Sequence, residues 1–300
     1  MKKKELLEIV NDVDILYRDE LDISSDISFG MEVEYTNLYF LKLINLLEKF
    51  NLDWKYVLDI SVSNTHFGGE LTSPIMYNKK EYWEEIKLVL KMMKNFNAGI
   101  NDDCAAHIHV GSDIYGEDIY KYYYMLKTWA IFEKEIMQFG YGEFDHLREN
   151  YRIFSIPIRS EILAYDALIK IVINDNISFL DKIKEISDYI SIFRNTSINL
   201  DNIKDKDIVD KNTIEIRVFN GTLNPVIWQN NINFVIHYLD YFNKDYDKEI
   251  IDYYFKKSRD NKLNLNKYDI DKGVLLGNLI FDNDIDNLYY LKQYTRGLKK

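Results

Sequence analysis

Three short stretches of this sequence carry chemically active side chains two residues apart. The pairs are Glu32 and Glu34, His107 and His109, and Glu215 and Arg217. Because side chains alternate between the two faces of a β-strand, both members of a pair point to one face and their apolar neighbours point to the other. Glutamate and histidine bind metals and arginine binds phosphate, whereas solvated strand faces more often carry Lys, Thr and Ser. The pattern predicts a sheet with one chemically active face.

A metal site is the chemistry that this face favours. Glu70 follows the paired glycines Gly68 and Gly69 and can reach the same face. Up to four carboxylates and two imidazoles would then converge, and one arginine cannot neutralise them, so a divalent cation is expected. Oxygen-rich ligation favours Mg²⁺ or Mn²⁺ over a three-ligand zinc site. An ordinary edge strand with a solvated face gives the same alternation and explains most such stretches taken singly.

Helices and strands are predicted around these stretches. Apolar residues at helical spacing predict helices over residues 2–21, 38–50, 79–97, 117–139, 159–173, 178–190 and 225–242. Alternating patterns predict strands at the three pairs, at 54–62, after Gly69 and at 193–200. No internal repeat or flexible linker divides the chain. We therefore expect an α+β fold, with an N-terminal helix in 1–27, a catalytic domain over 28–242 and a helical extension over 243–300.

Composition narrows the class of protein. The chain has 300 residues, of which 47% are hydrophobic, enough for a sizeable core. Its net charge of −11 argues against nucleic acid as a partner. Apolar runs such as 163–173 are too short and polar to span a membrane, and no signal-peptide pattern follows Met1, so we expect a cytoplasmic protein without a membrane partner. Cys104 is the only cysteine, which excludes an intramolecular disulfide.

An ordered set of motifs resembles the amidoligase family, a distant branch of the carboxylate-amine ligases related to glutamate-cysteine ligase. The motifs are FGMEVE at 29–34, DIS at 59–61, GELTSP at 69–74, HIH at 107–109 and TIEIRVFNGTLN at 213–224. The resemblance covers roughly residues 28–240. It implies a glutamine synthetase-like fold, which is a curved, mainly antiparallel sheet with helices on its outer face. It also implies ATP bound over metal ions, and an amide or isopeptide bond formed through an acyl phosphate.

The family's site residues are carried over onto the matching positions of this sequence. The resemblance implies metal ligands at Glu32, Glu34, Glu70, His107 and Glu215. It implies nucleotide contacts from His107, His109, Arg217 and Arg148. It implies catalytic roles for Arg217, Arg194 and Glu70, with Arg217 stabilising charge on the transferred phosphoryl group. The sequence departs from the family at Ala106, where glycine is more common directly before the histidine.

The cofactors implied are therefore ATP and Mg²⁺ or Mn²⁺. No glycine-rich phosphate loop of the G-x-x-x-x-G-K-[ST] or G-x-G-x-x-G type is present, so ATP would be held by metal ions and arginines. The implied substrates are a carboxylate and an amine, on small molecules or peptides. Nothing in the sequence selects among them.

Two other functions use the same residues. A metal-dependent hydrolase would activate water with the Glu/His cluster and would need no nucleotide. A non-catalytic module would bind a nucleotide or a metal with the same fold but would catalyse no reaction. Six charged or ionisable residues on neighbouring strands argue against the second alternative. Buried carboxylates that repel one another destabilise a fold, and a non-catalytic scaffold does not need them.

Overall fold

The computed structural model describes residues 3–59, 61–62, 67–164, 167–190, 195–203, 212–244, 246–258 and 263–299. Within these ranges the strands are β1 Phe29–Thr36, β2 Lys55–Val57, β3 Gly68–Thr72, β4 Ala105–Gly111, β5 Ile198–Asn199 and β6 Thr213–Asn220. They form one sheet in the order β2-β3-β1-β4-β6-β5, and every neighbouring pair is antiparallel. Helices make up most of the remaining structure, so the predicted α+β class is confirmed.

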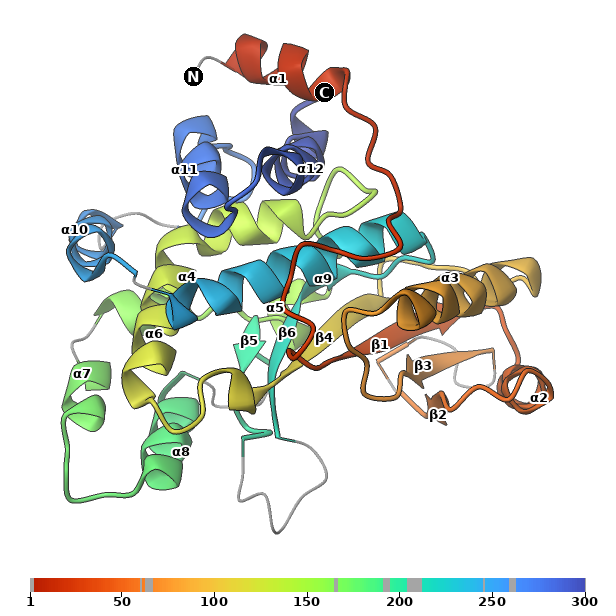
Figure 1. The fold of residues 1–300 in the computed structure, drawn as a ribbon, viewed down its shortest axis with the longest axis horizontal. Helices are drawn as coiled ribbons and strands as arrows, with labels where there is room; N and C mark the ends of the chain where they lie inside the picture. The colour runs from red at the N-terminus through yellow and green to blue at the C-terminus, as the bar shows by residue number, and fades with distance from the viewer. Residues whose placement is uncertain are drawn as a thin grey trace.

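Helices lie across one face of this sheet and beside its ends (Figure 1). They are α1 Lys3–Asn11, α2 Phe40–Lys49, α3 Lys80–Asn95, α4 Ile119–Phe139, α5 Tyr151–Phe154, α6 Arg159–Ala164, α7 Ala167–Val172, α8 Phe179–Ile190, α9 Pro225–Asp240, α10 Lys248–Ser258, α11 Ile270–Ile280 and α12 Asp284–Tyr294, with 3₁₀ turns η1 Ser112–Ile114, η2 Tyr241–Asn243 and η3 Arg296–Lys299. In the described residues, the predicted helix over 159–173 corresponds to α6 and α7, and the predicted strand over 54–62 is limited to β2. Within the described ranges, no helix has the length and apolar character needed to cross a membrane.

The core lies between the sheet and three helices. Val33, Ile108 and Ile216 lie on one face of the sheet and are fully buried. In Figure 1, α3, α4 and α9 run across the same side of the sheet. Phe29 of β1 stacks on Trp83 of α3, with ring centroids 5.3 Å apart. The apolar side chains that alternate along the strands therefore pack against the apolar stripes of the helices.

Helix α4 is the centre of the helical layer. It contacts β6 on one side and α6, α10, α11 and α12 on others. Its aromatic residues fill the spaces between these elements, and Trp129 and Phe139 are fully buried. A helix covered on several sides exposes little surface to water. This explains the run of large apolar residues along α4.

The N-terminal helix is shorter than predicted, because α1 ends at Asn11 rather than at residue 21. Acidic residues follow at Asp12 and Asp14, and negative charge disfavours continuation at the C-terminal end of a helix. The chain then runs without regular structure to β1, held by side-chain amides. Gln229 exchanges two 2.8 Å hydrogen bonds with the backbone of Arg18, and Asn78 accepts from Leu21 N at 3.0 Å and donates to Leu21 O at 2.8 Å.

Asp286 links this segment to α9 and α12 and makes stability depend on pH. Burial alone would raise the pKa of Asp286, but hydrogen bonds from His237 and Asn283 and the charge of Arg18 hold the pKa well below its usual range. A carboxyl whose folded pKa is depressed contributes stability above its unfolded pKa of about 3.9, and this contribution is lost as the pH falls toward the folded value. We expect Asp286→Asn to lower the free energy of unfolding by about 1–3 kcal/mol at pH 7.

Urea unfolding between pH 3 and pH 7 measures this dependence. The difference between wild type and Asp286→Asn should shrink as the pH falls below about 4. A difference that stays constant over the whole range would show that the carboxylate charge of Asp286 is not what stabilises the link.

Candidate active site

The strand register brings the predicted residues onto one face of the sheet. Glu34 on β1 lies opposite Glu70 on β3. Glu32 lies opposite His107 on β4. His109 lies opposite Glu215 on β6. Strands β3, β1, β4 and β6 are consecutive neighbours, so the side chains form one cluster on the face that points away from α3, α4 and α9.

The two imidazoles lie between the carboxylates of Glu32 and Glu215. His107 Nδ1 is 3.1 Å from Glu32 Oε2 and 3.9 Å from Glu215 Oε1. His109 Nε2 is 2.9 Å from Glu32 Oε1 and 4.0 Å from Glu215 Oε1. All four side chains belong to residues at most 8% exposed. At this burial the interactions are only weakly screened by water.

The carboxylates at the Glu215 end of the cluster lie close to groups that lower their pKa values. Burial alone would raise the pKa of Glu32, but hydrogen bonds from His107 and His109 hold that pKa well below its usual range. Burial would also raise the pKa of Glu215, yet the charge of Arg217 lowers it. Arg217 Nη1 pairs directly with Glu215 Oε1. Each of these two carboxylates therefore has a close partner in the cluster.

Charge is not balanced at the Glu70 end. Burial raises the pKa of Glu34, although the charge of His107 opposes this shift. Burial and the charges of Glu32 and Glu34 raise the pKa of Glu70 to about 9. The backbone N–H of Ala105 donates to Glu34 Oε2 at 2.7 Å, but no arginine or lysine pairs with either carboxylate among the described residues. A cation at this end would remove the repulsion.

The cluster contains overlapping groups of potential metal ligands. In each group the ligand atoms lie within 4.8 Å of one another; the groups are Glu32–His109–Glu215, Glu32–Glu70–His107 and Glu34–Asp59–Glu70. Glu32 and Glu70 each belong to two groups. Neighbouring groups therefore share a residue, and together they extend across the sheet.

The donor set also fits a hard divalent cation. His107 Nε2 is buried without a hydrogen-bond partner in the described structure and lies 3.6 Å from Glu34 Oε1. An imidazole nitrogen left this way beside carboxylates is available as a ligand. Carboxylate oxygens with a minority of imidazole suit Mg²⁺ or Mn²⁺.

A β-bulge in β6 interrupts its pairing with β4 beside the cluster. The β4–β6 register shifts between Ala106 and Ile108, opposite Phe219 and Ile216. Ala106 is fully buried on the apolar side, so the alanine that departs from the family pattern lies away from the cluster. Bulges are common beside active sites, where they redirect a side chain. His107 points into the cluster because β4 alternates regularly and pairs in register with β1, where His107 lies opposite Glu32.

The structure places Arg148 away from the position expected of a nucleotide contact. Arg148 is only 1% exposed, and its Nη1 and Nη2 donate to the carbonyl oxygens of Phe219 at 2.6 Å and Arg217 at 3.0 Å. Its pKa is lowered to about 10 by burial. It therefore binds main-chain carbonyl groups of β6, the strand that carries Arg217, and a nucleotide contact from it stays a prediction. Arg194 lies outside the described residues.

Two residues join the cluster that the predicted site leaves out. Asp59 belongs to a ligand group with Glu34 and Glu70. Asn199 donates from Nδ2 to Glu215 Oε2 at 2.9 Å. The DIS motif contains the first residue, and the polar stretch before residue 200 contains the second. Neither could be assigned to the cluster from spacing alone, because each lies outside the long, regularly alternating strands.

A cavity adjoins the cluster at Glu32 and His109. Its volume is about 300 Å³, and its lining also includes Thr72, Ile75 and Thr213. Cavities of this size are typical of small-molecule sites. Thr213 Oγ1 lies 3.0 Å from His109 Nδ1, which fixes the orientation of the ring at the cavity wall. A substrate group in this cavity would lie directly beside the cluster.

Comparison with known protein families gives a match to this chain. The family model described as "Putative amidoligase enzyme" matches residues 48–239, which is nearly two thirds of the chain. The match includes β3, β4 and β6 with Glu70, His107 and Glu215, whereas β1 precedes it. No curated protein matches the sequence. The matched region spans more than half of the chain, and the chain belongs to the amidoligase family, a family of ligase-type enzymes.

Proposed function

We propose that this protein is an ATP- and divalent-metal-dependent ligase that joins a carboxylate to an amine. The observation that carries the proposal is the row of carboxylates and imidazoles from β3 to β6, in which Glu70 and Glu34 at one end form no ion pair with a described arginine or lysine. Membership of the amidoligase family supports it. An antiparallel sheet with helices on one face and acidic residues on the other is also what a glutamine synthetase-like fold requires, and we include that fold in the proposal.

The residues divide into metal ligands and substrate contacts. Mg²⁺ or Mn²⁺ would be held by Glu32, Glu34, Glu70, His107 and Glu215, and would neutralise phosphate charge and polarise a phosphoryl oxygen. Arg217 lies at the edge of the cluster, where its guanidinium can bind the charge that develops on the transferred phosphoryl group. His109, between Glu32 and the cavity, would contact the nucleotide or the substrate.

The reaction would proceed in two steps. A substrate carboxylate oxygen attacks the γ-phosphorus of ATP, the bond to the β-phosphate oxygen breaks, and an acyl phosphate and ADP result. The amine nitrogen then attacks the acyl carbon, phosphate leaves, and the nitrogen loses a proton. The cavity beside Glu32 and His109 is a suitable place for one of these substrates, because it is adjacent to the cluster and excludes bulk water from one side.

Calorimetry with ATP, ADP and a non-hydrolysable ATP analogue, with and without Mg²⁺ or Mn²⁺, tests the proposal. We expect nucleotide binding that requires the metal and is lost in Glu34→Gln. Glu81→Gln is the matched control, because Glu81 is exposed on α3 away from the cluster. Metal binding without nucleotide binding would favour a metal-dependent hydrolase instead. Binding of neither would contradict both functions.

A further inference from the structure

A glycine inside β1 leaves the acidic face open beside Glu32. Gly30 lies two positions before Glu32 on the strand, so the two residues share this face. Gly30 is also opposite His109 on β4. All three residues line the cavity of about 300 Å³ beside the cluster. At Gly30 the floor of this cavity is therefore main chain rather than a side chain.

The backbone conformation does not require glycine at this position. Positive φ values, which favour glycine, occur at Gly69, Gly116 and Gly142 but not at Gly30. The pairing of β1 with β4 runs through Gly30 without a register shift, so no bulge lies there. Glycine weakens the interior of a strand, because it has no side chain to pack. Glycine at position 30 is therefore unfavourable for β1 taken alone.

Packing does not require glycine there either. A Cβ atom at Gly30 would lie 3.7 Å from Ser73 Oγ and 3.9 Å from the Cβ atom of His109, which are ordinary van der Waals distances. Gly111 also lines the cavity but differs, because a Cβ atom there would collide with the side chain of Asp113. A glycine inside a strand often marks the place where a ligand approaches the backbone closely. Among the described residues, that is the remaining explanation for Gly30.

The side chains on either side of Gly30 are held in place. Ser73 Oγ accepts a hydrogen bond from Met31 N at 2.9 Å and donates one to Pro74 O at 2.8 Å. The ring of His109 is held by its hydrogen bond to β6. A side chain added at position 30 would therefore project into the cavity rather than displace its walls.

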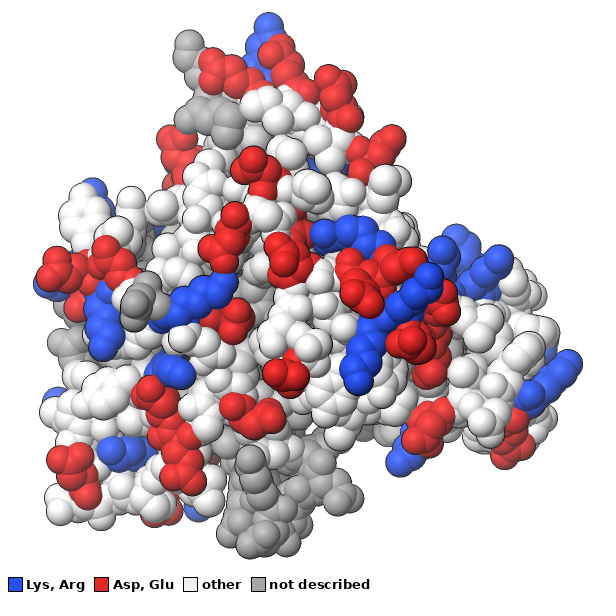
Figure 2. Space-filling view, viewed as in Figure 1, with Lys and Arg blue, Asp and Glu red and all other residues white. Residues whose placement is uncertain are grey.

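The cavity combines apolar surface with polar groups. Pro74 and Ile75 contribute apolar surface, and Ile75 is 65% exposed. Glu32 and His109 contribute polar groups next to Gly30. Charge is a poorer guide to the ligand than shape, since acidic and basic side chains are interspersed on the face seen in Figure 2. An aliphatic chain with a polar end group suits this combination, because the chain can contact the apolar surface while the end group lies beside the cluster.

We propose that Gly30 determines substrate specificity, because it leaves room for an aliphatic chain next to the reacting group of a substrate. The chain would lie against the main chain of β1, with its end group beside Glu32 and His109. The identity of the end group rests on the proposed ligase function, which uses one carboxylate and one amine. The slot is fixed before the substrate arrives, which reduces the ordering cost of binding.

Calorimetric titration of pentylamine and of pentanoate into the whole protein, with and without Mn²⁺, tests the proposal. We expect saturable binding of pentylamine if the cavity holds the amine substrate, and of pentanoate if it holds the carboxylate substrate. Gly30→Val should weaken binding of that probe by about tenfold or more, because the added methyl groups fill the slot. Gly30→Ala should weaken it less, in the same direction.

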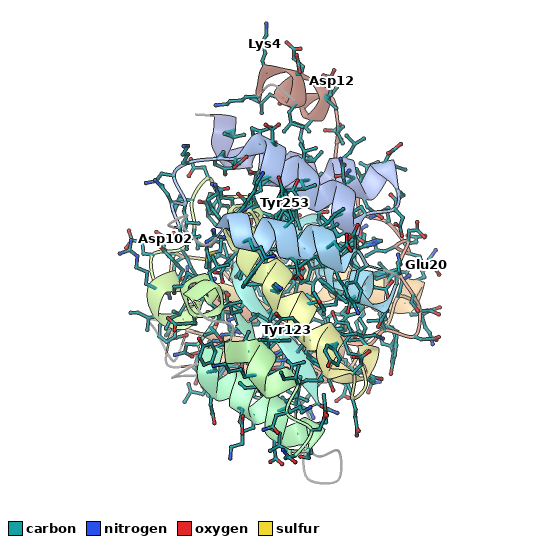
Figure 3. The ribbon with its side chains drawn as sticks, turned by 90° about the vertical axis from the view of Figure 1, so that its left-hand side faces the viewer. Lys4, Asp12, Glu20, Asp102, Tyr123 and Tyr253 are labelled. Carbon is teal, nitrogen blue, oxygen red and sulfur yellow. The ribbon has the colours of Figure 1, made fainter. Side chains whose placement is uncertain are left out.

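Ile250→Ala is the matched control for Ile75→Ala on the cavity wall. Both isoleucines are exposed, but Ile250 lies on α10, the helix that carries Tyr253 in Figure 3, and does not line the cavity. Ile75→Ala should weaken probe binding by about fivefold, because it removes apolar contact with the chain. Ile250→Ala should leave probe affinity unchanged.

Circular dichroism and Mn²⁺ affinity show whether each variant keeps its fold and its cluster. If Gly30→Val does not fold, Gly30→Ala decides, because its Cβ atom meets no described atom closer than 3.7 Å. Absence of saturable binding of both probes to wild type, or equal binding to wild type and the folded Gly30 variants, would overturn the proposal. Failure of the proposed ligase function would appear separately, as absence of metal-dependent ATP binding to wild type.

Discussion

Glu32→Gln is expected to lower the affinity for Mg²⁺ or Mn²⁺ by at least about 100-fold and to remove ligase activity with it. Glu32 belongs to two of the three ligand groups, so its loss affects both. It is also the carboxylate that both His107 and His109 contact. Glutamine keeps the volume and can still hydrogen-bond to the imidazoles, so we expect the free energy of unfolding to stay within about 1 kcal/mol of wild type.

Metal titration followed by calorimetry, together with urea unfolding, separates these two effects. Glu81→Gln controls for the loss of a surface charge. A variant of Glu32 that unfolds readily yet still binds metal as well as wild type would contradict the assignment, because it would give this carboxylate a structural rather than a metal-binding role.

Glu133→Ala is expected to have the largest effect on stability, with a loss of at least about 3 kcal/mol in the free energy of unfolding. Glu133 is fully buried in α4. Its Oε1 accepts hydrogen bonds from Ile158 N at 2.8 Å and Ser197 Oγ at 2.5 Å, and its Oε2 accepts from Arg159 N at 2.8 Å. Alanine would leave these donors buried without partners where α6 begins.

Thermal and urea unfolding of Glu133→Ala and of Glu185→Ala measure the effect. Glu185 is exposed on α8, so its replacement by alanine should change stability by no more than about 0.5 kcal/mol. Equal stability of the two variants would show that the donors around Glu133 find other partners. Glu133→Gln should fall between wild type and alanine, because its amide retains one acceptor oxygen.

The acidic face could be predicted from the sequence because strand alternation is a local property. Glu32, Glu34, His107 and His109 lie on strands long enough to show it, and their apolar neighbours confirm the direction of each side chain. Asp59 could not be assigned in this way. It follows the three-residue strand β2, and its position beside Glu34 depends on how the chain leaves that strand.

Features that depend on contacts between distant parts of the chain could also not be predicted from the sequence. Apolar residues continue at helical spacing past Asn11, so the local pattern favours the helix predicted over 2–21. The side chains of Asn78 and Gln229, however, hydrogen-bond to the backbone of this segment and favour an extended path. The interior position of Arg148 depends on carbonyl groups of β6, about 70 residues along the chain. Tertiary context overrides propensity in both cases.

The pairing of β4 with β6 has a consequence for folding. His109 and Thr213 are in contact across 104 residues of chain, and pairings of such long range form slowly because a large loop must first be closed. The segment up to Gly111 already carries Glu32, Glu34, Glu70 and His107, whereas Glu215 and Arg217 arrive only when β6 docks. A chain still folding therefore presents an acidic half-site without its arginine, and the enzyme becomes competent only at the last strand pairing.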